Sequence, residues 1–500
     1  MSYGGQKMNN LIVLPMVIPI FTGIILIFFR RYIRIQRWVS FGAVALTAGI
    51  SFYILQMIQV DGILRLDFGG WLPPYGIVFV ADSFAMLLVL TASLVTLVSL
   101  MYAFYTIGKK REQLFFYSFV LFLLGGVNGS FLTGDLFNLF VMFEVMLLSS
   151  YVLATLGGTK RQLRESLKYV AINILSSWFF LVGLAYLYGT LGTLNMAHLS
   201  ERIAEVGQTP LLTTISIVFL IVFSLKAGLL LYIWLPGTYS SPPTVVAALF
   251  GALLTKVGIY ALFRTFTLLF YHEPEITHTL IGIMAGLTLV GGSIGAIAYK
   301  DIRQIVSYNV VIAVGFILVG LAVTTEVAFA GSIYYLVHDI LVKALLFLLA
   351  GTMISLTGRT KINEMSGLIR NYPLLGWMFF ITLLSLTGIP PLSGFIGKVL
   401  VGQGAVQAGS YGLLALAFIS SIFILYSLLR IFMNTFWGET IISKEDQVPL
   451  RTRLIVPLVL LTGATIGLGL GAESIALYVK DAAHTLMNPH IYIDAVLDRP

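Results

Sequence analysis

Residues 225–260 read LKAGLLLYIWLPGTYSSPPTVVAALFGALLTKVGIY and place two lysines, Lys226 and Lys256, inside stretches as apolar as a membrane helix. Between the lysines lie Pro236 and a Pro-Pro pair at 242–243, and proline removes a backbone donor and stops or breaks a helix. A charged side chain at the centre of a bilayer costs about 3 kcal/mol on insertion scales, so such residues usually face a protein interior or a water-filled path. This stretch therefore predicts an interrupted membrane helix and a route for protons.

Composition supports a membrane protein independently of this stretch. Of the 500 residues, 58% are hydrophobic and 10% are charged, and the mean hydropathy is +0.95. A soluble globular domain carries about 25% charged residues. The net charge of +8 is attributed to basic loops on one side of the membrane, so we expect no nucleic-acid partner.

The sequence shows no pattern typical of a catalytic or cofactor site. It contains no cysteine, which excludes disulfides and thiolate-held metal or iron–sulfur sites. GxGxxG, P-loop, metal-ligand and catalytic-triad patterns are also absent from it. We therefore expect a protein that is not itself an enzyme and holds no cofactor, and any redox chemistry would belong to a partner.

At about 20 residues per crossing, the hydrophobic runs predict an all-α polytopic membrane protein with about 14 transmembrane helices. The first run is kept as a spanning helix because the basic pair Arg30 and Arg31 follows it, whereas a signal peptide carries its charges first. The predicted spans are 11–29, 37–59, 82–107, 114–132, 136–155, 164–189, 211–233, 243–270, 278–298, 303–322, 327–356, 372–404, 410–437 and 453–479.

Basic residues in the loops predict the orientation, because loops rich in Lys and Arg face the cytoplasm. The loops after spans 1, 3, 5, 9, 11 and 13 carry Arg30, Arg31, Arg34, Arg37, Lys109, Lys110, Arg111, Lys160, Arg161, Arg164, Lys168, Lys300, Arg303, Arg359, Lys361, Arg370, Lys444, Arg451 and Arg453. The opposite side carries Lys7, Arg65, Arg202, Lys480 and Arg499. Both termini are therefore expected outside.

Two spans are interrupted in a similar way, at Gly228 and Pro236 in span 7 and at Gly388 and Pro390 in span 12. Gly/Pro interruptions at matching positions of two halves are a sequence sign of a transporter site between repeats. If spans 4–8 and 9–13 are the halves, the odd number of spans in each turns the second half upside down. Broken helices 7 and 12 would then be counterparts, each with a lysine.

The order of the predicted spans divides the chain into four expected parts. They are N-terminal helices 1–3 (residues 1–112), a first five-helix repeat (113–270), a second, inverted five-helix repeat (271–437), and a C-terminal helix 14 with a tail (438–500).

Few ionisable side chains fall inside the predicted spans, and they form the candidate site. Burial disfavours the charged form of such a group and a neighbour of opposite charge restores it, so these groups can load and release protons. Histidine titrates nearest neutrality and suits a relay or a gate. The candidates are Glu144, Lys226, Lys256, His338, Lys343 and Lys398, with Asp339 next to His338 and with Arg264 and Arg430 nearer span ends.

Four further motifs join the opening stretch in resembling a known family. They are TGDLFNLFVMFEVMLLSSYVL (133–153), KDIRQIVSYNVVIAVGFILVG (300–320), LVHDILVKALLFLLAGTM (336–353) and TGIPPLSGFIGK (387–398). Together they resemble the antiporter-like membrane subunits shared by respiratory complex I and Mrp-type cation/proton antiporters. The wording SSPPTVVAALF at 240–250 is more similar to the antiporter branch.

The resemblance implies a proton-translocating subunit of a multisubunit cation (Na⁺)/proton antiporter in the bacterial plasma membrane, with six companion subunits. It also implies a glutamate on span 5, lysines on spans 7, 8 and 12 and a histidine–lysine pair on span 11, all along a central polar axis. These positions fall on Glu144, Lys226, Lys256, Lys398, His338 and Lys343.

One segment departs from the family pattern. The residues between Lys226 and Trp234 lack the usual proline and are one residue short. The helix break is therefore expected closer to Pro236.

We expect Glu144 and Lys226 to form an ion pair that opens and closes, worth about 4 kcal/mol at 4 Å with an effective dielectric constant of 20. When the pair opens, Lys226 would pass its proton towards Lys256, and from there through span 11 to Lys398.

The cation path is expected largely in a partner or at an interface. A hard cation such as Na⁺ prefers several oxygen ligands, whereas the axis offers mainly lysines. The local candidates are Asp135, Asn138 and Thr133.

Other interpretations remain open from the sequence. In one alternative, His338 and Lys343 only anchor span 11, and Asp339 only orients His338. In another, Arg264 and Arg430 snorkel near span ends or hold loop carbonyls. The main alternative function is a proton-pumping, antiporter-like subunit of complex I or of a membrane-bound hydrogenase. A self-sufficient solute carrier is less favoured because no polar pocket beyond the charge axis is visible.

Overall fold

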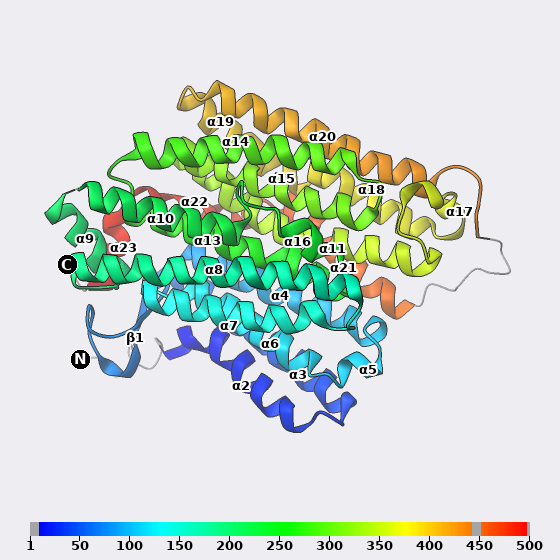
Figure 1. Cartoon of the computed structure of the whole chain (residues 1–500), viewed down its shortest axis with the longest axis horizontal. Coiled ribbons are helices and arrows are strands. Elements are labelled where there is room, and N and C mark those ends of the chain that lie inside the picture. The colour runs from blue at the N-terminus through cyan, green and yellow to red at the C-terminus, as the bar shows by residue number, and fades with distance from the viewer. Residues whose placement is uncertain (1–9, 208, 443–451, 498–500) are drawn as a thin grey trace.

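A computed structural model describes residues 10–207, 209–442 and 452–497. It is a bundle of long helices that run roughly side by side (Figure 1). Twelve of the described helices are long and apolar enough to cross a membrane, and two shorter apolar helices, Phe116–Leu132 and Pro373–Thr387, lie where spans 4 and 12 are predicted. The all-α membrane fold is thus confirmed, while the count of fourteen crossings and the two repeats stay predictions.

The membrane-length and apolar elements follow the predicted spans closely. They are α2 (Leu14–Phe28), α3 (Ile33–Asp61), α4 (Ser83–Thr106), α6 (Phe116–Leu132), α7 (Leu136–Thr155), α8 (Lys160–Leu191), α10 (Pro210–Ala227), α12 (Thr244–Leu249) with its continuation α13 (Thr255–Leu268), α14 (Pro274–Ala298), α15 (Ile302–Val323), α16 (Glu326–Thr357), α18 (Pro373–Thr387), α19 (Ser393–Gln407), α20 (Tyr411–Phe436) and α21 (Thr452–Leu470).

The shorter elements lie mostly in the connections. They are η1 (Asn10–Val13), β1 (Leu64–Asp67), η2 (Phe68–Gly70), β2 (Val78–Ala81), α5 (Lys109–Glu112), α9 (Met196–Val206), α11 (Leu235–Ser240), the π-helical turn η3 (Phe250–Leu254), η4 (Ile362–Glu364), α17 (Leu368–Asn371), α22 (Glu473–Met487) and α23 (Pro489–Leu497).

Burial places the core of the bundle at α12–α13, α15 and α16. The most apolar window of the helix Thr244–Leu268 is 100% buried, against 33% for α20 and 28% for α21. An element that is apolar all round and enclosed on every side belongs to the centre of a bundle. The charged residues of α13 and α16 are therefore at the centre, away from lipid.

Span 7 breaks directly after Lys226, so the expectation of a break near Pro236 is wrong. The helix α10 ends at Ala227, and Gly228 takes the left-handed conformation (φ +77°) while its N–H donates to Ser224 O at 2.9 Å. Glycine adopts this conformation at no steric cost and often ends helices. Pro236 lies in the first turn of α11, where a missing N–H is harmless.

Span 12 breaks where the sequence predicts. The helix α18 ends at Thr387, Gly388 is left-handed (φ +88°), and α19 begins at Ser393 after the two prolines. Both interruptions thus use a left-handed glycine as the helix cap. They differ in where the lysine lies, because Lys226 precedes its break and Lys398 follows its own.

The C-terminal part differs from the prediction. The predicted span 453–479 is too long, since α21 ends at Leu470 and a separate helix, α22, starts at Glu473. The final helix, α23, contacts α9 and β1, and β1 pairs antiparallel with β2 (Leu64 opposite Ala81). The sequence prediction assigned no structure to β1, β2, α9 or α23.

These additional elements gather at one end of the bundle, whereas α5 and α17 lie at the opposite end (Figure 1). The described parts near the two chain ends, η1 and α23, both contact β1. This is compatible with termini on one side of a membrane. Lys7, Lys444, Arg451 and Arg499, which enter the predicted orientation, lie outside the described residues.

Candidate functional site

The centre of the bundle holds a buried cluster of two lysines around one carboxylate. Lys256 Nζ lies 2.7 Å from Asp339 Oδ2, and Lys343 Nζ lies 3.6 Å from Asp339 Oδ1. The side chains of all three are at most 1% exposed. One carboxylate can neutralise only one of the two ammonium groups, so the cluster has room for exchange of a proton between its members.

A π-helical turn sets the position of Lys256. The turn Phe250–Leu254 interrupts the α-helix immediately before it, and Lys256 Nζ donates to Gly251 O at 2.7 Å. π-Helical turns inside α-helices are frequent at functional sites, because they release backbone groups from the regular ladder. The lysine is thus held by a backbone carbonyl on one side and by Asp339 on the other.

The cluster is only partly satisfied in hydrogen bonds. Within the described residues, neither carboxylate oxygen of Asp339 nor Lys343 Nζ has a partner with hydrogen-bond geometry, although the charges lie within ion-pair distance. Buried polar atoms of this kind are rare in folded proteins and call for an explanation. Asp339 thus holds Lys256 closely and Lys343 more loosely.

His338 faces the break in span 12. Its Nδ1 lies 2.7 Å from Ser393 Oγ, and Ser393 Oγ lies 3.2 Å from Ser385 Oγ. Its Nε2 has no partner among the described residues. The ring therefore connects the helix of Asp339 to both half-helices of the broken span.

Lys398 reaches back from α19 to the end of α18. Its Nζ donates to Leu386 O at 3.0 Å, to Thr387 O at 2.8 Å and to Ser421 Oγ at 2.8 Å. The last carbonyls of a helix carry partial negative charge and favour a cation. The ammonium group of Lys398 thus has three hydrogen-bond acceptors, and it lies at the far end of the candidate axis.

Glu144 and Lys226 are joined through a serine that the sequence analysis did not single out. Ser177 Oγ donates to Glu144 Oε1 at 2.5 Å, and Lys226 Nζ donates to Ser177 Oγ at 3.3 Å. No ion pair within 4.0 Å joins the two charged groups in the described structure, so the expected direct pair is not formed. Lys226 is buried and also lies over the Phe143 ring, 5.1 Å from its centroid.

The two halves of the axis meet at a glycine. A Cβ atom built on Gly258 would lie 2.5 Å from Ala227 N and 2.8 Å from Lys226 C, which is closer than real Cβ contacts. Only glycine therefore lets α13 approach the end of α10 this closely. Gly258 is two residues from Lys256, so the helix of the central cluster packs directly on the backbone of Lys226.

Arg264 does not snorkel and does not hold loop carbonyls, so that expectation is wrong. It is 3% exposed, and its Nη2 lies 2.5 Å from Asp82 Oδ2. Its Nε donates to Tyr260 OH at 3.2 Å, and its guanidinium lies 4.8 Å from the Tyr492 ring centroid. The pair ties α13 to the start of α4 and to α23.

Arg430 holds backbone carbonyls, as one of its expected roles states. Its Nη1 donates to Ile297 O at 2.7 Å, and its Nη2 donates to Tyr299 O. Both carbonyls lie at the end of α14. We therefore place Arg430 outside the candidate axis.

The local cation candidates are engaged in a helix cap. Asp135 Oδ1 accepts from Asn138 N at 2.9 Å, and Asn138 Nδ2 donates to Thr133 Oγ1 at 2.9 Å. Burial raises the pKa of Asp135, which precedes the membrane helix, to about 6. These contacts account for the three residues without a cation, and the described residues contain no group of three or more His, Asp or Glu side chains arranged to hold a metal ion.

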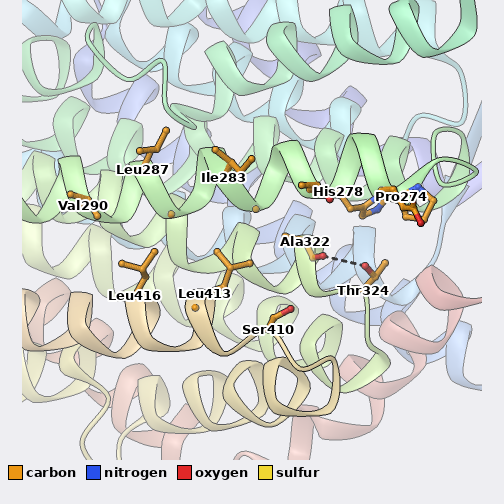
Figure 2. A pocket seen from close by; sticks show the side chains of 15 residues that line it. Pro274, His278, Ile283, Leu287, Val290, Ala322, Thr324, Ser410, Leu413 and Leu416 are labelled. Atoms are coloured by element: carbon orange, nitrogen blue, oxygen red, sulfur yellow. Dashed lines mark hydrogen bonds between the residues drawn. The ribbon is translucent and has the colours of Figure 1, made fainter. Parts of the chain in front are cut away.

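Several cavities lie away from the axis, and two of them differ clearly in their walls. One, of about 710 Å³, follows α14 and the start of α20, and Figure 2 shows its mostly apolar wall, including Ile283, Leu287 and Leu413. The other is smaller and polar and lies at the end of the bundle that carries α5. Neither is lined by a residue of the proton axis.

Comparisons with known proteins give the chain a family. Residues 133–424 match the family model described as NADH:quinone oxidoreductase/Mrp antiporter, TM. The chain is 50% identical, over 98% of its length, to the whole of the D-type subunit of the Na(+)/H(+) antiporter of Bacillus subtilis.

Solved structures agree with this assignment. A chain in the structure of the Mrp complex from Dietzia sp. superposes with a TM-score of 0.93 at 28% identity, covering 98% of this chain and 100% of that one. A chain of the membrane-bound sulfane sulfur reductase, an archaeal respiratory membrane complex, superposes with a TM-score of 0.89 at 26% identity, with the same coverage. The family match and the full-length identity to an antiporter subunit confirm the resemblance found in the sequence: this chain belongs to the NADH:quinone oxidoreductase/Mrp antiporter family of membrane subunits.

Proposed function

We propose that this chain is the proton-translocating D-type subunit of a multisubunit Na⁺/H⁺ antiporter of the bacterial plasma membrane. Its companions would be subunits of the A, B, C, E, F and G types, and its substrates H⁺ and, through the complex, Na⁺. The full-length similarity to the D-type subunit of an Na(+)/H(+) antiporter supports this assignment. The observation that carries it is the buried Lys256–Asp339–Lys343 cluster, which lies between the Glu144–Ser177–Lys226 chain and Lys398.

In the central cluster, Lys256 and Lys343 share the carboxylate of Asp339. With an effective dielectric constant near 20, a contact at the 2.7 Å of Lys256 is worth about 6 kcal/mol and one at the 3.6 Å of Lys343 about 4.6 kcal/mol. The difference of about 1.5 kcal/mol corresponds to roughly tenfold in an equilibrium constant. A small movement of Asp339 from one lysine to the other therefore changes which of them keeps its proton.

Ser177 provides the first step. A serine hydroxyl both donates and accepts a hydrogen bond, and Ser177 contacts Glu144 on one side and Lys226 on the other. A proton delivered to Glu144 weakens its attraction for the lysine. Lys226 is then expected to release its proton towards Lys256. The helix that carries Lys256 packs at Gly258 against the backbone of Lys226.

His338 and Lys398 provide the last steps. His338 is adjacent to Asp339 in the chain and contacts Ser393 at the break of span 12. Lys398 is held by two helix-terminal carbonyls and Ser421, which stabilise its charged form. A proton that reaches Lys398 is thus retained until the surrounding contacts change.

Sodium is assigned mainly to the companion subunits or to an interface. The axis contains four lysines, Lys226, Lys256, Lys343 and Lys398, and a hard cation is repelled by such groups and prefers oxygen ligands. The oxygen-bearing candidates around Asp135 are already used in a helix cap.

The alternative is a proton-pumping subunit of a redox complex. It is supported by the similarity to a chain of a respiratory membrane complex, and a shared fold does not separate the two functions. Purification with native companions decides the matter: six small membrane proteins favour the antiporter, and proteins with iron–sulfur clusters or quinone sites favour the redox complex.

The test of the proposal is exchange activity in everted membrane vesicles. Glu144→Ala and Lys226→Ala are expected to abolish Na⁺-dependent H⁺ movement while the complex still assembles. Glu205→Gln, in an exposed ion pair with Arg202 at 3.0 Å, is the matched control and should exchange normally. Normal exchange in both axis variants would refute the proposal.

A further inference from the structure

A polar cavity of about 200 Å³ lies at the end of the bundle where α4, α5, α8, α12 and α15 meet. Its wall includes Arg111, Arg303, Thr159, Gln162, Ser241 and Thr244, and among the described residues no Asp or Glu side chain contributes to it. By its basic loops, this end is the one expected to face the cytoplasm. The cavity is separate from the proton axis.

Arg111 has no local counter-charge in the part of the chain that the structure describes. Within the described residues it forms no ion pair and no side-chain hydrogen bond. The neighbouring carboxylate of Glu112 is already bound by Arg37 at 2.7 and 3.0 Å and by Tyr117 OH at 2.7 Å. The guanidinium of Arg111 is therefore free to bind a ligand in the cavity.

Arg303 is in a similar position. The Oδ1 atom of Asp301 accepts from the backbone N–H groups of Arg303 and Gln304 at 3.0 and 3.3 Å, as a helix cap. Asp301 attracts the Arg303 guanidinium and Arg161 repels it, but no ion pair within 4.0 Å forms in the described structure. The positive charge of Arg303 is thus only partly compensated.

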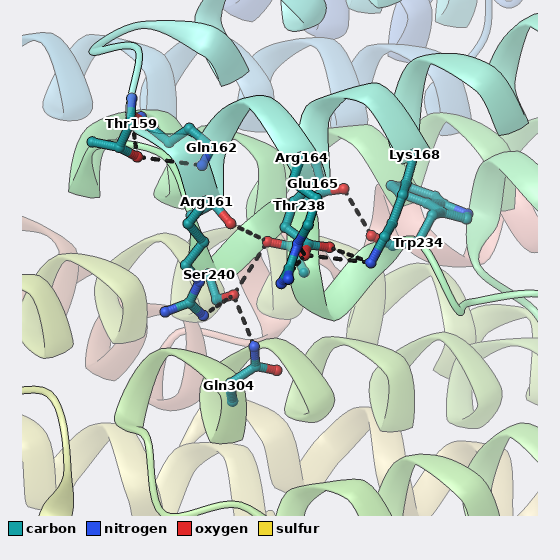
Figure 3. Close-up of polar contacts among 12 residues, drawn as sticks. Thr159, Arg161, Gln162, Arg164, Glu165, Lys168, Trp234, Thr238, Ser240 and Gln304 are labelled. Carbon is teal, nitrogen blue, oxygen red and sulfur yellow. Dashed lines mark hydrogen bonds and ion pairs between the residues drawn. The ribbon is translucent and has the colours of Figure 1, made fainter.

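The other polar groups near this end are already paired, as Figure 3 shows. Ser240 Oγ accepts from Arg161 Nη2 and from Gln304 Nε2, each at 3.1 Å. Glu165 is bound by Arg164 at 2.7 Å and by Lys168 at 3.3 Å. Among the described residues, Glu112 and Glu165 are thus engaged elsewhere, and Asp301 compensates the charge of Arg303 only in part.

We propose that this cavity binds an oxyanion of the phosphate class between Arg111 and Arg303. Arginine binds phosphate oxygens through a planar fork of donors. A volume of about 200 Å³ equals that of roughly six or seven waters at about 30 Å³ each, which suits one phosphate group. The phosphate is either free or the headgroup phosphate of a lipid.

Because of where the cavity lies, a ligand bound in it would contact the linker between two helices of the axis. The linker residues 241–243 join α11, the second piece of broken span 7, to the helix that carries Lys256. A bound oxyanion would connect this linker to α5 and α15. It would thereby restrain the segment between Lys226 and Lys256.

The test measures thermal unfolding of the assembled, purified complex. Sodium phosphate is titrated against sodium chloride at matched ionic strength, and in a second arm nanodiscs of phosphatidylglycerol are compared with nanodiscs of a galactolipid, which carries no phosphate. We expect saturable stabilisation of the parent and of Arg34→Gln, the control, because Arg34 is exposed on the same end and does not line the cavity. Arg111→Gln and Arg303→Gln should each weaken the apparent affinity about tenfold or more, and the double variant should lose the response.

Two supporting outcomes identify the source of the oxyanion. A response to free phosphate indicates a soluble ligand, and a response to phosphatidylglycerol alone indicates a lipid headgroup. Arg303→Lys keeps the charge and should bind more tightly than Arg303→Gln, which keeps the test informative if the double variant does not assemble. The proposal is overturned if neither phosphate source gives an arginine-dependent response, as when an acidic side chain of a companion subunit fills the cavity.

Discussion

Two buried carboxylate–cation contacts in this chain look alike in geometry and differ in chemistry. Asp82 contacts Arg264 at 2.5 Å, and Asp339 contacts Lys256 at 2.7 Å. Arginine stays protonated under all conditions relevant to proteins, whereas a buried lysine changes its charge readily. The first pair is therefore fixed, and the second can take part in proton transfer.

The surroundings of the two pairs reinforce this difference. Asp82 Oδ1 accepts from Ala85 N at 2.8 Å, so both of its oxygens have partners. Asp339 is instead shared between two lysines, with Lys256 Nζ at 2.7 Å and Lys343 Nζ at 3.6 Å. A carboxylate held by a backbone N–H and an arginine has one fixed arrangement, whereas one shared between two lysines can change partner.

Removing the carboxylate of the fixed pair should have the largest effect. Asp82→Asn leaves the Arg264 charge buried and uncompensated, which costs about 3–5 kcal/mol. We expect little assembled complex and a lowered unfolding temperature, measured after affinity purification. Glu205→Gln, in an exposed pair, should change neither. A normal yield of Asp82→Asn would show that the pair is not structural.

Removing the carboxylate of the exchangeable cluster should affect transport more than assembly. After Asp339→Asn the two lysines can relieve their repulsion by losing a proton, which Arg264 cannot do. We expect Na⁺-dependent H⁺ movement in everted vesicles to fall at least a hundredfold, the lower end for loss of a proton-transfer group, with the complex still formed.

The control for this variant is Glu326→Gln, at the exposed start of the same helix. It should leave exchange unchanged. The comparison between the two pairs fails if Asp339→Asn disrupts assembly as strongly as Asp82→Asn, or if it exchanges ions at the parent rate.

Ser177 allows a finer test of the axis. Ser177→Ala removes the hydroxyl between Glu144 and Lys226, and loss of a hydrogen bond to a charged group corresponds to roughly a tenfold decrease in rate. The neighbouring Ser176 is also buried but donates to Val222 O at 3.3 Å, so Ser176→Ala is the matched control. Equal rates in the two variants would remove Ser177 from the path.

Asp135 allows a test that leaves transport aside, as a buried carboxylate with no cation in ion-pair contact among the described residues. Its pKa in the folded protein, about 6, lies above the ordinary 3.8, so the stability it contributes is present at low pH and lost as pH rises through 6. The loss is at most about 3 kcal/mol. Asparagine also caps helices, so Asp135→Asn should unfold at a higher temperature than the parent at pH 8.

The pH dependence makes this last prediction specific. The difference between Asp135→Asn and the parent should shrink when the thermal scans are repeated at pH 5. A difference that is independent of pH would mean that the carboxylate is not the cause.

Much of the candidate site was predictable from the sequence because membrane burial makes charges conspicuous. Lys226, Lys256, Lys343 and Lys398 stand out in apolar runs, and the structure buries all four. The partners of these lysines were less visible. Ser177 and Ser393 are short polar residues that apolar helices tolerate, so only their contacts with Glu144 and His338 distinguish them.

Other features depended on packing at a distance. The partner of Arg264 is Asp82, which lies 182 residues away in the chain, and nothing in the local sequence links them. The break of span 7 at Gly228 instead of near Pro236 was likewise missed. Proline is compatible with the first turn of a helix, so its presence alone does not locate the interruption.

The sequence by itself determined the class of protein, the positions of the apolar helices, the interruption of two of them and the identity of the buried charges. It did so because hydrocarbon demands long apolar runs and makes every charge costly. The tertiary structure alone decided which charge faces which: Asp339 between two lysines, Ser177 between Glu144 and Lys226, and Arg264 with Asp82. Electrostatic contacts depend on distances of a few ångströms between helices remote in the chain, and those distances are set only when the bundle packs.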